Sequence, residues 1–337
     1  MNKKNILISL FSFVVLSFGV FFYFVFFQIN IYSCDKRLNL GEETSYELFL
    51  KKLQKEEIVS NLSSLKIAMQ VFRWRNRGVK QGSYKINKDF SNFEFLNKIT
   101  RGEQDPLKIT VRHYETKEEL AEYLGRHLMF DEKDFLQLLN NEEFLKKYNV
   151  NKNNVLTLFI ANTYQVYWNI SLQKFFDRID KEFKNFWTKE KSEKAQNLKL
   201  TPNEVIILAS IVEKEIVRQE EASVIAGVFI NRLAKKMRLQ SDPTTFYARK
   251  YDSQKNDVSS CMRGAKSGYN TYRFAGLPIG PICIPSLRTI DAVLNYEKHD
   301  FLFFVTAPDR THHLLTQTFQ NHRKNINYTF KKHKISK

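Results

Sequence analysis

Residues 208–215 read Leu-Ala-Ser-Ile-Val-Glu-Lys-Glu, and they end a segment whose beginning is also well marked. Thr201 and Glu204 fit a Thr-x-x-Glu capping box, and Pro202 suits the first turn of a helix. Residues 205–217 are apolar almost all round the helix axis, which is typical of a buried helix. We therefore predict a buried helix that carries two carboxyl groups at its C-terminal end.

The two glutamates of this helix have different neighbours along the chain. The residues three and four positions from Glu213 are uncharged, whereas Glu215 has Arg218 three residues further on. Burial without a nearby cation raises the pKa of a carboxyl group, and an adjacent arginine lowers it. We therefore predict that Glu213 is the carboxyl held protonated near neutral pH. The competing hypothesis, that both are solvated charges at a helix end, stays open on this evidence.

Composition places broad limits on the class of protein. The 337 residues are 43% hydrophobic and include 29 Phe, which is typical of an ordered chain with room for two or three small domains. The formal charge of +17 fits nucleic acid, anionic lipid or an acidic polymer as a neighbour, and charge alone does not choose among them. Three cysteines are too few for a disulfide scaffold, and no His or Cys spacing resembles a metal site.

The N-terminus carries a long apolar run. Residues 5–34 hold no charge and residues 6–29 are almost continuously apolar, which at about 1.5 Å per residue spans a hydrocarbon core of roughly 30 Å. Two lysines precede the run, so the positive-inside rule places the N-terminus in the cytoplasm. A cleaved signal peptide is the competing hypothesis, but the run is long and has no Ala-x-Ala exit. We predict an uncleaved anchor over residues 1–35, and an extracytoplasmic remainder that excludes nucleic acid as a partner.

The middle of the chain predicts small mixed modules over residues 36–105 and 106–190. A strand followed by a short helical pattern occurs at residues 83–99 and again at residues 108–128. Such modules bind carbohydrate or a partner chain, or serve as a spacer, and both hypotheses stay open. The polar, charged residues 190–199 predict a linker before the capped helix.

Loops after the glutamate helix carry side chains suited to sugars. Pro243 predicts an extended or turn conformation for Asp242, so that Gln240 and Asp242 are rigidly presented outside a helix. Aromatic faces stack on sugar rings, and amide and hydroxyl groups hydrogen-bond to sugar hydroxyls. The competing hypothesis is a tyrosine-rich edge of the core. The residues predicted to hold the sugar are Gln240, Asp242, Tyr269, Asn270, Thr271 and Tyr272.

At these residues the chain resembles the MltG (YceG-like) family of membrane-anchored endolytic murein transglycosylases. The matching stretches follow the family's order and spacing, and they are residues 208–215, 228–233, 237–244, 269–272, 276–278 and 280–282. Departures from the family pattern also occur. Residues 277–280 read Leu-Pro-Ile-Gly where many members of the family have Leu-Pro-Pro-Gly. Residues 160–164 read Ile-Ala-Asn-Thr-Tyr where the usual family sequence is Phe-Pro-Asp-Thr-Tyr. The family's Gly-x-His-x-Phe reads Thr-His-His-Leu-Leu at 311–315, where His313 is the candidate for substrate binding.

The resemblance implies an α+β fold with an N-terminal transmembrane helix, small LysM-like αβ modules and a mixed α+β catalytic domain at residues 191–337. It implies cleavage of the β-1,4 bond between N-acetylmuramic acid and N-acetylglucosamine within peptidoglycan strands, with 1,6-anhydro ends and without a cofactor or metal. The implied partners are glycan strands, the cytoplasmic membrane and peptidoglycan synthases. The implied role is to end the elongation of nascent strands from a single-pass position, with the catalytic domain in the periplasm.

Helical geometry bears on the mechanism. Glu213 and Glu215 lie about 200° apart around the axis, so they cannot both flank one bond as the two carboxyl groups of an ordinary glycosidase do. One dominant carboxyl fits a lytic transglycosylase. Glu213 would protonate the leaving oxygen and then accept the proton of the muramic C6 hydroxyl, with Glu215 assigned to the substrate side. A relay role for Asp242 stays open.

Three other hypotheses stay open. A muramidase would cut the same bond with water, and a non-catalytic membrane scaffold would bind peptidoglycan through the small modules and the tyrosine loop. Cys261 and Cys283 bracket that loop, so a disulfide outside the cytoplasm is a further hypothesis.

Overall fold

The computed structural model describes residues 3–31, 36–42, 44–71, 78–252, 264 and 266–335. The chain forms two compact units. The first comprises Met1–Lys108, His127–Met129 and Gln165–Ser171, and the second comprises Ile109–Arg126, Phe130–Tyr164 and Leu172–Lys337. The module boundaries predicted from the sequence stay predictions, and each unit is described by itself.

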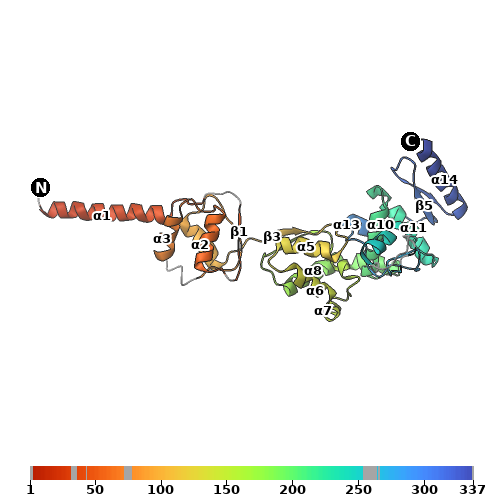
Figure 1. The fold of residues 1–337 in the computed structure, drawn as a ribbon, viewed down its shortest axis with the longest axis horizontal. Helices are drawn as coiled ribbons and strands as arrows, with labels where there is room; N and C mark the ends of the chain where they lie inside the picture. The colour runs from red at the N-terminus through yellow and green to blue at the C-terminus, as the bar shows by residue number, and fades with distance from the viewer. Residues whose placement is uncertain are drawn as a thin grey trace. The chain divides into compact units, whose positions relative to one another are not determined.

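The first unit contains an N-terminal helix followed by a strand–helix–helix–strand arrangement and a further helix (Figure 1). Its two strands pair antiparallel, with the buried side chains of Leu38 and Tyr84 opposite each other. A capping box between Ser91 and Glu94 begins the last helix. The likeness to LysM stays a prediction. The elements are α1 (Lys3–Phe26), β1 (Arg37–Leu40), α2 (Tyr46–Lys55), α3 (Leu62–Val71), β2 (Gly82–Lys85) and α4 (Asn92–Arg101).

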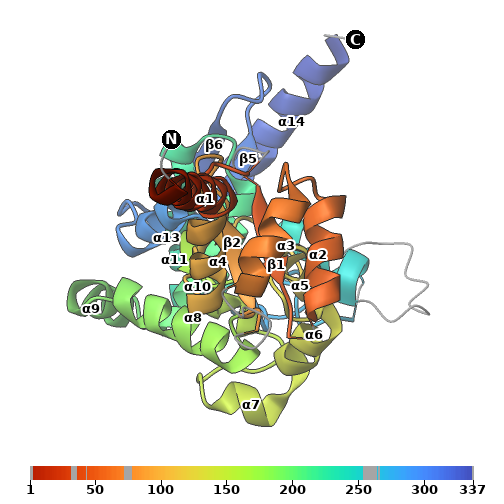
Figure 2. The same cartoon turned by 90° about the vertical axis from the view of Figure 1, so that its left-hand side faces the viewer.

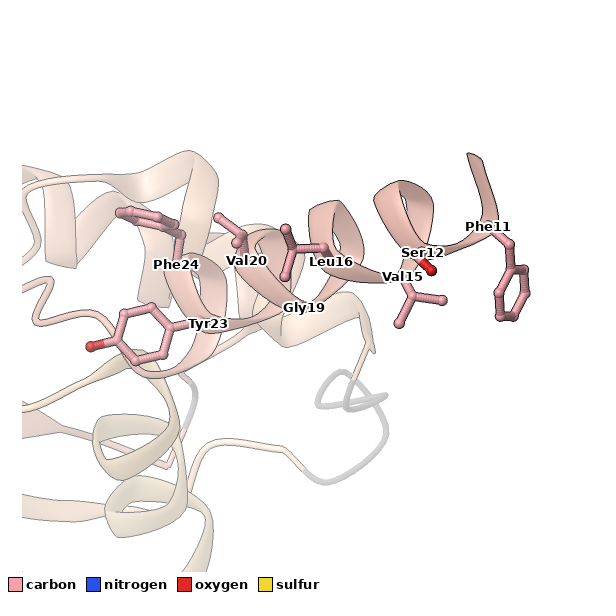
Figure 3. A pocket seen from close by; sticks show the side chains of 8 residues that line it. All are labelled: Phe11, Ser12, Val15, Leu16, Gly19, Val20, Tyr23 and Phe24. Atoms are coloured by element: carbon pink, nitrogen blue, oxygen red, sulfur yellow. The ribbon is translucent and has the colours of Figure 1, made fainter. Parts of the chain in front are cut away.

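Helix α1 is long and apolar enough over Asn5–Phe26 to cross a membrane, and among the described residues it is the one helix that is. Most of its side chains are exposed, and Figure 3 shows Phe11, Leu16 and Phe24 standing out from the helix. The helix ends at Phe26, before the end of the apolar run in the sequence. The reason is that Ile29 leaves the helix to form an antiparallel bridge within the first unit.

Helices dominate the second unit. Strands β3 (Leu107–Thr110) and β4 (Thr163–Val166) form a two-stranded sheet. The other elements are α5 (Lys117–His127), α6 (Glu132–Asn140), α7 (Glu142–Lys146), η2 (Val155–Leu158), α8 (Leu172–Phe186), α9 (Lys189–Asn197), α10 (Pro202–Glu215), η3 (Gln219–Glu221), α11 (Ala222–Ala234), α12 (Asp242–Tyr247), the π-helical turn η4 (Ala248–Asp252), α13 (Leu287–Leu294), β5 (Phe303–Thr306), β6 (His313–Thr316) and α14 (Phe319–Ile335).

The linker predicted at residues 190–199 is wrong, because most of this segment forms α9. The hydroxyl of Thr188 accepts a hydrogen bond from the backbone N–H of Lys191 and so caps the helix. Glu190 and Lys194 pair one turn apart at 2.7 Å. The polar composition of residues 190–199 is therefore that of a short, largely exposed helix and not of a linker.

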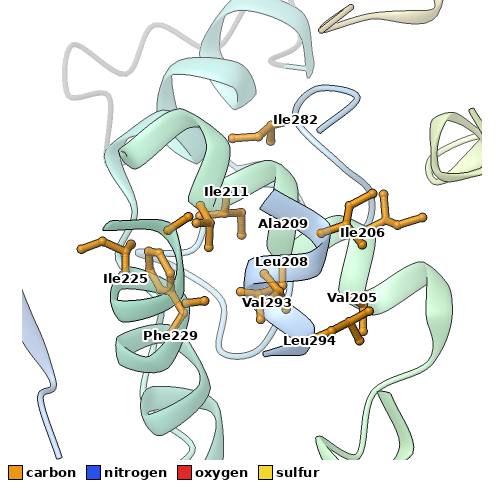
Figure 4. Packing of buried hydrophobic residues seen from close by; sticks show 14 of the residues in the cluster. Val205, Ile206, Leu208, Ala209, Ile211, Ile225, Phe229, Ile282, Val293 and Leu294 are labelled. Atoms are coloured by element: carbon orange, nitrogen blue, oxygen red, sulfur yellow. The ribbon is translucent and has the colours of Figure 1, made fainter. Parts of the chain in front are cut away.

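Helix α10 is the centre of the second unit, and the prediction of a buried helix is confirmed. Residues 205–212 are all buried, and Figure 4 shows Leu208, Phe229 and Val293 meeting where α10, α11 and α13 pack together. Burying an aliphatic or phenyl side chain of this size stabilises the fold by roughly 1.5–3 kcal/mol. The predicted capping box is also present between Thr201 and Glu204. The end of α10 is therefore held firmly in place.

The C-terminal part forms a hairpin and a helix. Strands β5 and β6 pair antiparallel, with Thr306 opposite His313. Helix α14 lies beside this hairpin in both views (Figures 1 and 2). The rings of Phe304 on β5 and Phe229 on α11 meet edge to face with centroids 5.7 Å apart. The hairpin is thereby joined to the core around α10.

Candidate functional site

Glu215 is the last residue of α10, and its carboxyl group lies in a desolvated position. Its Oε1 accepts a hydrogen bond from Oγ of Ser241 at 2.6 Å. Burial raises the pKa of Glu215 to about 7; the Ser241 hydrogen bond opposes this rise, the charge of Asp242 adds to it, and the charge of Arg232 reduces it. The expectation that Arg218 lowers this pKa was wrong. Glu215 is therefore protonated in a large fraction of molecules at neutral pH.

Arg232 does not cancel the effect of burial, because its guanidinium group is already engaged. The residue is buried, and its Nε and Nη1 each donate a 2.6 Å hydrogen bond, to the backbone oxygens of Leu302 and Leu239. The same group lies 5.3 Å from the ring centroid of Phe303. Arg232 thus joins α11 to two neighbouring segments and acts on Glu215 through its charge only.

Glu213 has a different environment, on the side of α10 that faces α13. Its Oε2 accepts hydrogen bonds from Oγ and N of Ser286, at 2.9 and 3.3 Å, and from the hydroxyl of Thr289. Its Oε1 lies 3.3 Å from Nδ1 of His113, a ring that is about half exposed. The carboxylate therefore links the C-terminal end of α10 to the N-terminal end of α13 and to the segment that holds His113.

The residue between the two glutamates points in a third direction. Nζ of Lys214 lies 2.5 Å from Oε1 of Glu115, and the hydroxyl of Tyr251 donates a 2.8 Å hydrogen bond to the other carboxylate oxygen. This pair borders a hollow of about 340 Å³ that the ring of Phe246 also lines. Residues 213–215 thus reach three separate surroundings, as helical geometry requires.

The loop at residues 240–244 is tied to the tyrosine loop through hydroxyl groups. The backbone N–H of Ser241 donates to Oγ1 of Thr271 at 3.0 Å, and the hydroxyls of Thr244 and Thr271 are 2.8 Å apart. Gln240 has a left-handed φ of 48° and is exposed. Asp242 is exposed too, but it begins helix α12 instead of lying in an extended segment. Proline is tolerated in the first turn of a helix, which explains this difference from the prediction.

The four residues of the tyrosine loop divide into two groups. The Tyr272 hydroxyl donates a 2.7 Å hydrogen bond to Oδ1 of Asp242, which brings Tyr272 to the Glu215 side of the unit. Tyr269, Asn270 and Thr271 are buried. The Tyr269 ring packs 4.7 Å from that of Tyr247, and Oδ1 of Asn270 accepts from the backbone N–H of Tyr272. The buried three hold the loop in shape, as the competing core-edge hypothesis would have them.

His313 is buried in the hairpin and is bound to an acidic partner. Its backbone N–H and its Nδ1 lie 2.6 and 3.2 Å from the two carboxylate oxygens of Glu221, and its Nε2 lies 3.4 Å from the Thr306 hydroxyl. The ring also meets that of Phe304 edge to face. Both ring nitrogens of His313 therefore contact side chains inside the protein, Glu221 on η3 and Thr306 on β5.

Cys283 is buried, its Sγ lies 3.7 Å from the backbone oxygen of Ser210, and burial raises its pKa to about 12. Cys261 lies outside the described residues. A disulfide between the two therefore stays a prediction.

Several residues of this cluster had not been singled out by sequence reasoning. Ser241 and Arg232 lie inside the matching stretches, but nothing in their spacing indicates contact with, or charge effects on, Glu215. Ser286 caps helix α13, and its place in the sequence does not indicate contact with Glu213. His113 carried no signal at all, because it lies 100 residues before Glu213.

Taken together, the geometry defines an α+β protein with one desolvated carboxyl group at the end of a rigid buried helix. A carboxylic acid whose pKa lies near the working pH can donate a proton and then take one back. The exposed side chains of Gln240 and Asp242 and the half-buried side chain of Tyr272 lie in the loops beside it. The described site thus combines a carboxyl group of raised pKa with polar side chains in the neighbouring loops.

Comparison with known proteins identifies the family of the chain. The profile of the YceG-like family matches residues 38–328. A protein of Bacillus subtilis (strain 168) named endolytic murein transglycosylase is 26% identical over 304 residues, covering 85% of this chain and 82% of that protein. A protein of the same name from Streptococcus pneumoniae (strain D39) is 27% identical over 287 residues, covering 74% of this chain. This chain spans about half (50%) of the streptococcal protein.

The fold has a solved counterpart as well. The crystal structure of the yceG-like protein lmo1499 from Listeria monocytogenes superimposes with a TM-score of 0.56 at 23% identity, covering 86% of this chain and 98% of that one. This chain belongs to the YceG-like family. The resemblance seen in the sequence is thereby confirmed.

Proposed function

We propose that this protein is a membrane-anchored lytic transglycosylase that cuts peptidoglycan within its glycan strands. The names of the Bacillus and Streptococcus relatives support the substrate and the reaction. The observation that carries the proposal is the carboxyl group of Glu215, desolvated at the end of the family-matching helix with its pKa raised to about 7. Such a group is suited to donating a proton at neutral pH.

Glu215 is our candidate for the acid in place of Glu213. Glu213 receives hydrogen bonds from Ser286 and Thr289 and lies beside His113, so its carboxylate oxygens are already engaged in holding α13. Glu215 has the hydroxyl of Ser241 on one oxygen and a neighbouring negative charge at Asp242 that favours its protonated form. Glu213 remains the alternative acid, and substitution of each glutamate in turn distinguishes the two candidates.

The reaction needs only one carboxyl group. Glu215 protonates the glycosidic oxygen as the bond from that oxygen to C1 of the muramic residue breaks. The C6 hydroxyl of the same residue attacks C1, and the Glu215 carboxylate accepts the hydroxyl proton. One C–O bond is broken and one is formed, the acid is regenerated, and the product carries a 1,6-anhydro end. No water molecule and no second carboxyl group take part.

The polar groups in the loops beside the acid would hold the sugars. Gln240, Asp242 and Tyr272 offer amide, carboxylate and hydroxyl groups, and their loops are fixed through Thr271. Tyr269, Asn270 and Thr271 serve the site by shaping the loop. His313 supports the hairpin and is not needed for binding in this proposal.

The anchor would set where the enzyme works. We assign α1 to a single crossing of the cytoplasmic membrane with the N-terminus inside, which places residues from Asp35 onward outside the cytoplasm. An active site held near the membrane can reach glycan strands as they emerge, so cleavage would end their elongation beside the peptidoglycan synthases. A LysM-like first module would bind glycan in this arrangement.

Digestion of purified peptidoglycan by the full chain tests the proposal, with the product ends identified by mass spectrometry. We expect 1,6-anhydromuramic ends from within strands. Reducing muramic ends that carry added water would instead establish a muramidase. Binding without any cleavage would establish a scaffold, and either of these outcomes overturns the proposal.

A further inference from the structure

The last turn of α1 is part of the core of the first unit. Val25 and Phe26 are 4% and 1% exposed and lie in the hydrophobic cluster to which α3 and α4 also contribute. Just beyond the helix, Ile29 forms an antiparallel bridge with Ser91, the residue that caps α4. The direction of α1 is therefore fixed relative to α3 and α4.

A buried network of amide side chains strengthens this junction. Nδ2 of Asn92, a fully buried residue, donates to the backbone oxygen of Val25 at 2.5 Å and to Oγ of Ser64 at 2.8 Å. Its Oδ1 accepts from Nδ2 of Asn30 at 2.8 Å, and Oδ1 of Asn30 accepts from the backbone N–H of Asn61 at 2.7 Å. A satisfied buried network of this kind favours a single geometry, because breaking it leaves unpaired polar groups.

Beside this junction lies a hollow of about 510 Å³ between α1 and α3. Its lining combines apolar side chains with uncharged polar groups, and none of the described residues that line it is charged. Phe24, one of its apolar lining residues, is labelled in Figure 3. The apolar lining includes Phe21, Phe24 and Ile29, and the polar lining includes Gln28, Asn61 and Ser63.

The position of the hollow along α1 indicates what would fill it. The candidate membrane span ends at Phe26, and Phe21 lies only about 7–8 Å before that end at 1.5 Å per residue. If α1 crosses the bilayer, the hollow lies where hydrocarbon gives way to the polar lipid groups. A ligand there needs an apolar part as well as hydrogen-bonding oxygens, which describes one end of a phospholipid.

We propose that this hollow holds the glycerol-ester and phosphate end of a phospholipid, so that the first unit is docked on the bilayer surface. The inference rests on the proposed membrane anchor but not on the catalytic proposal. Because Gln28, Asn61 and Ser63 are uncharged, the site should accept zwitterionic and anionic phospholipids about equally. This recognition differs from attraction of a basic surface to anionic lipid.

Photo-crosslinking of the full chain in lipid nanodiscs tests the proposal. A benzophenone amino acid replaces Ser63, which is exposed in the hollow, or Leu48, which is 53% exposed on α2 and does not line it. We expect phospholipid adducts at position 63 to exceed those at position 48 about tenfold or more, by mass spectrometry, in nanodiscs of either lipid charge. Equal adducts at both positions, or none at position 63, would overturn the proposal.

A second experiment fills the hollow. Ser63→Trp should reduce the phospholipid retained by the detergent-purified protein in native mass spectrometry, whereas Leu48→Trp should not. Retention unchanged by Ser63→Trp contradicts the site. Alkaline washing of membranes tests the membrane anchor separately. Release of the full chain by the wash would contradict both the anchor and the lipid site. Neither result changes whether the purified enzyme cuts peptidoglycan, so the two proposals fail independently.

Discussion

Glu213 and Glu215 are two residues apart on α10, but their carboxyl groups lie in different surroundings. Glu213 faces α13, where Ser286, Thr289 and His113 all approach its carboxylate. Glu215 faces the start of α12, where burial and the charge of Asp242 raise its pKa to about 7. In our proposal these two carboxyl groups on one helix have different roles: Glu213 holds α13 in place and Glu215 transfers the proton. The predictions below test that division.

The largest expected effect is on cleavage. Glu215→Gln keeps the shape of the side chain and removes the exchangeable proton, so we expect activity to fall by about 10²–10⁴-fold, the range for general acid–base catalysis. The measurement is the rate at which new strand ends form in purified peptidoglycan. Glu213→Gln is the matched control, expected to lose less than about tenfold. The reverse ranking would make Glu213 the acid.

The second effect concerns stability and pH. Glu215 has a pKa of about 7 in the folded protein against an ordinary value of 4.5. Below pH 4.5 the group is protonated in both states; between pH 4.5 and 7 only the unfolded state ionises, so stability falls as pH rises, by on the order of 1–3 kcal/mol. Denaturant midpoints across pH 4–8 should show this fall, and Glu215→Gln should reduce it. Parallel curves for the two proteins would argue against the raised pKa.

The third effect concerns the structural role of Glu213. Glu213→Ala leaves the hydroxyls of Ser286 and Thr289 without their acceptor, and we expect a loss of about 1–3 kcal/mol in the free energy of unfolding. Chemical denaturation measures it. Ser60→Ala is the control, because it removes a hydroxyl from the first unit. We expect it to leave the stability of the second unit unchanged. A variant as stable as the wild type would show that Glu213 does not hold α13.

The fourth effect shifts the pH profile without removing the acid. Loss of the Ser241 hydroxyl in Ser241→Ala should raise the pKa of Glu215, because that hydrogen bond favours the charged form. Asp242→Asn should lower it, because a neighbouring negative charge is removed. The alkaline limb of kcat/KM should therefore move up in the first variant and down in the second. Shifts in the same direction would rule out Glu215 as the titrating group.

The smallest effect is expected at the substrate-binding loop. Tyr272→Phe removes one hydrogen bond to Asp242, worth about 0.5–1.5 kcal/mol. We expect KM for glycan to rise by less than about tenfold with kcat nearly unchanged. Tyr269→Phe, which removes a hydroxyl bonded to the backbone of Asn153 inside the unit, should act on stability instead. A fall in kcat alone for Tyr272→Phe would point to a role in the chemical step.

The sequence by itself determined the elements whose signals are local. The capping box at Thr201, the apolar segment that follows it and the long run that becomes α1 are each encoded within a few turns of chain, and the structure contains all three. Order and spacing of the matching stretches were also enough to identify the family. These predictions succeeded because caps, periodicity and hydropathy depend on residues close together in sequence.

Tertiary structure decided the surroundings of each glutamate. From neighbours along the helix, Glu213 had looked isolated and Glu215 had looked paired with Arg218. The partners that matter come from distant segments: Ser286 lies 73 residues after Glu213, and Ser241 lies 26 residues after Glu215. A pKa depends on the solvent removed and on charges within a few ångströms, whatever their place in the chain. Folding alone brings those groups together, so only the folded structure could divide the roles of the two carboxyls.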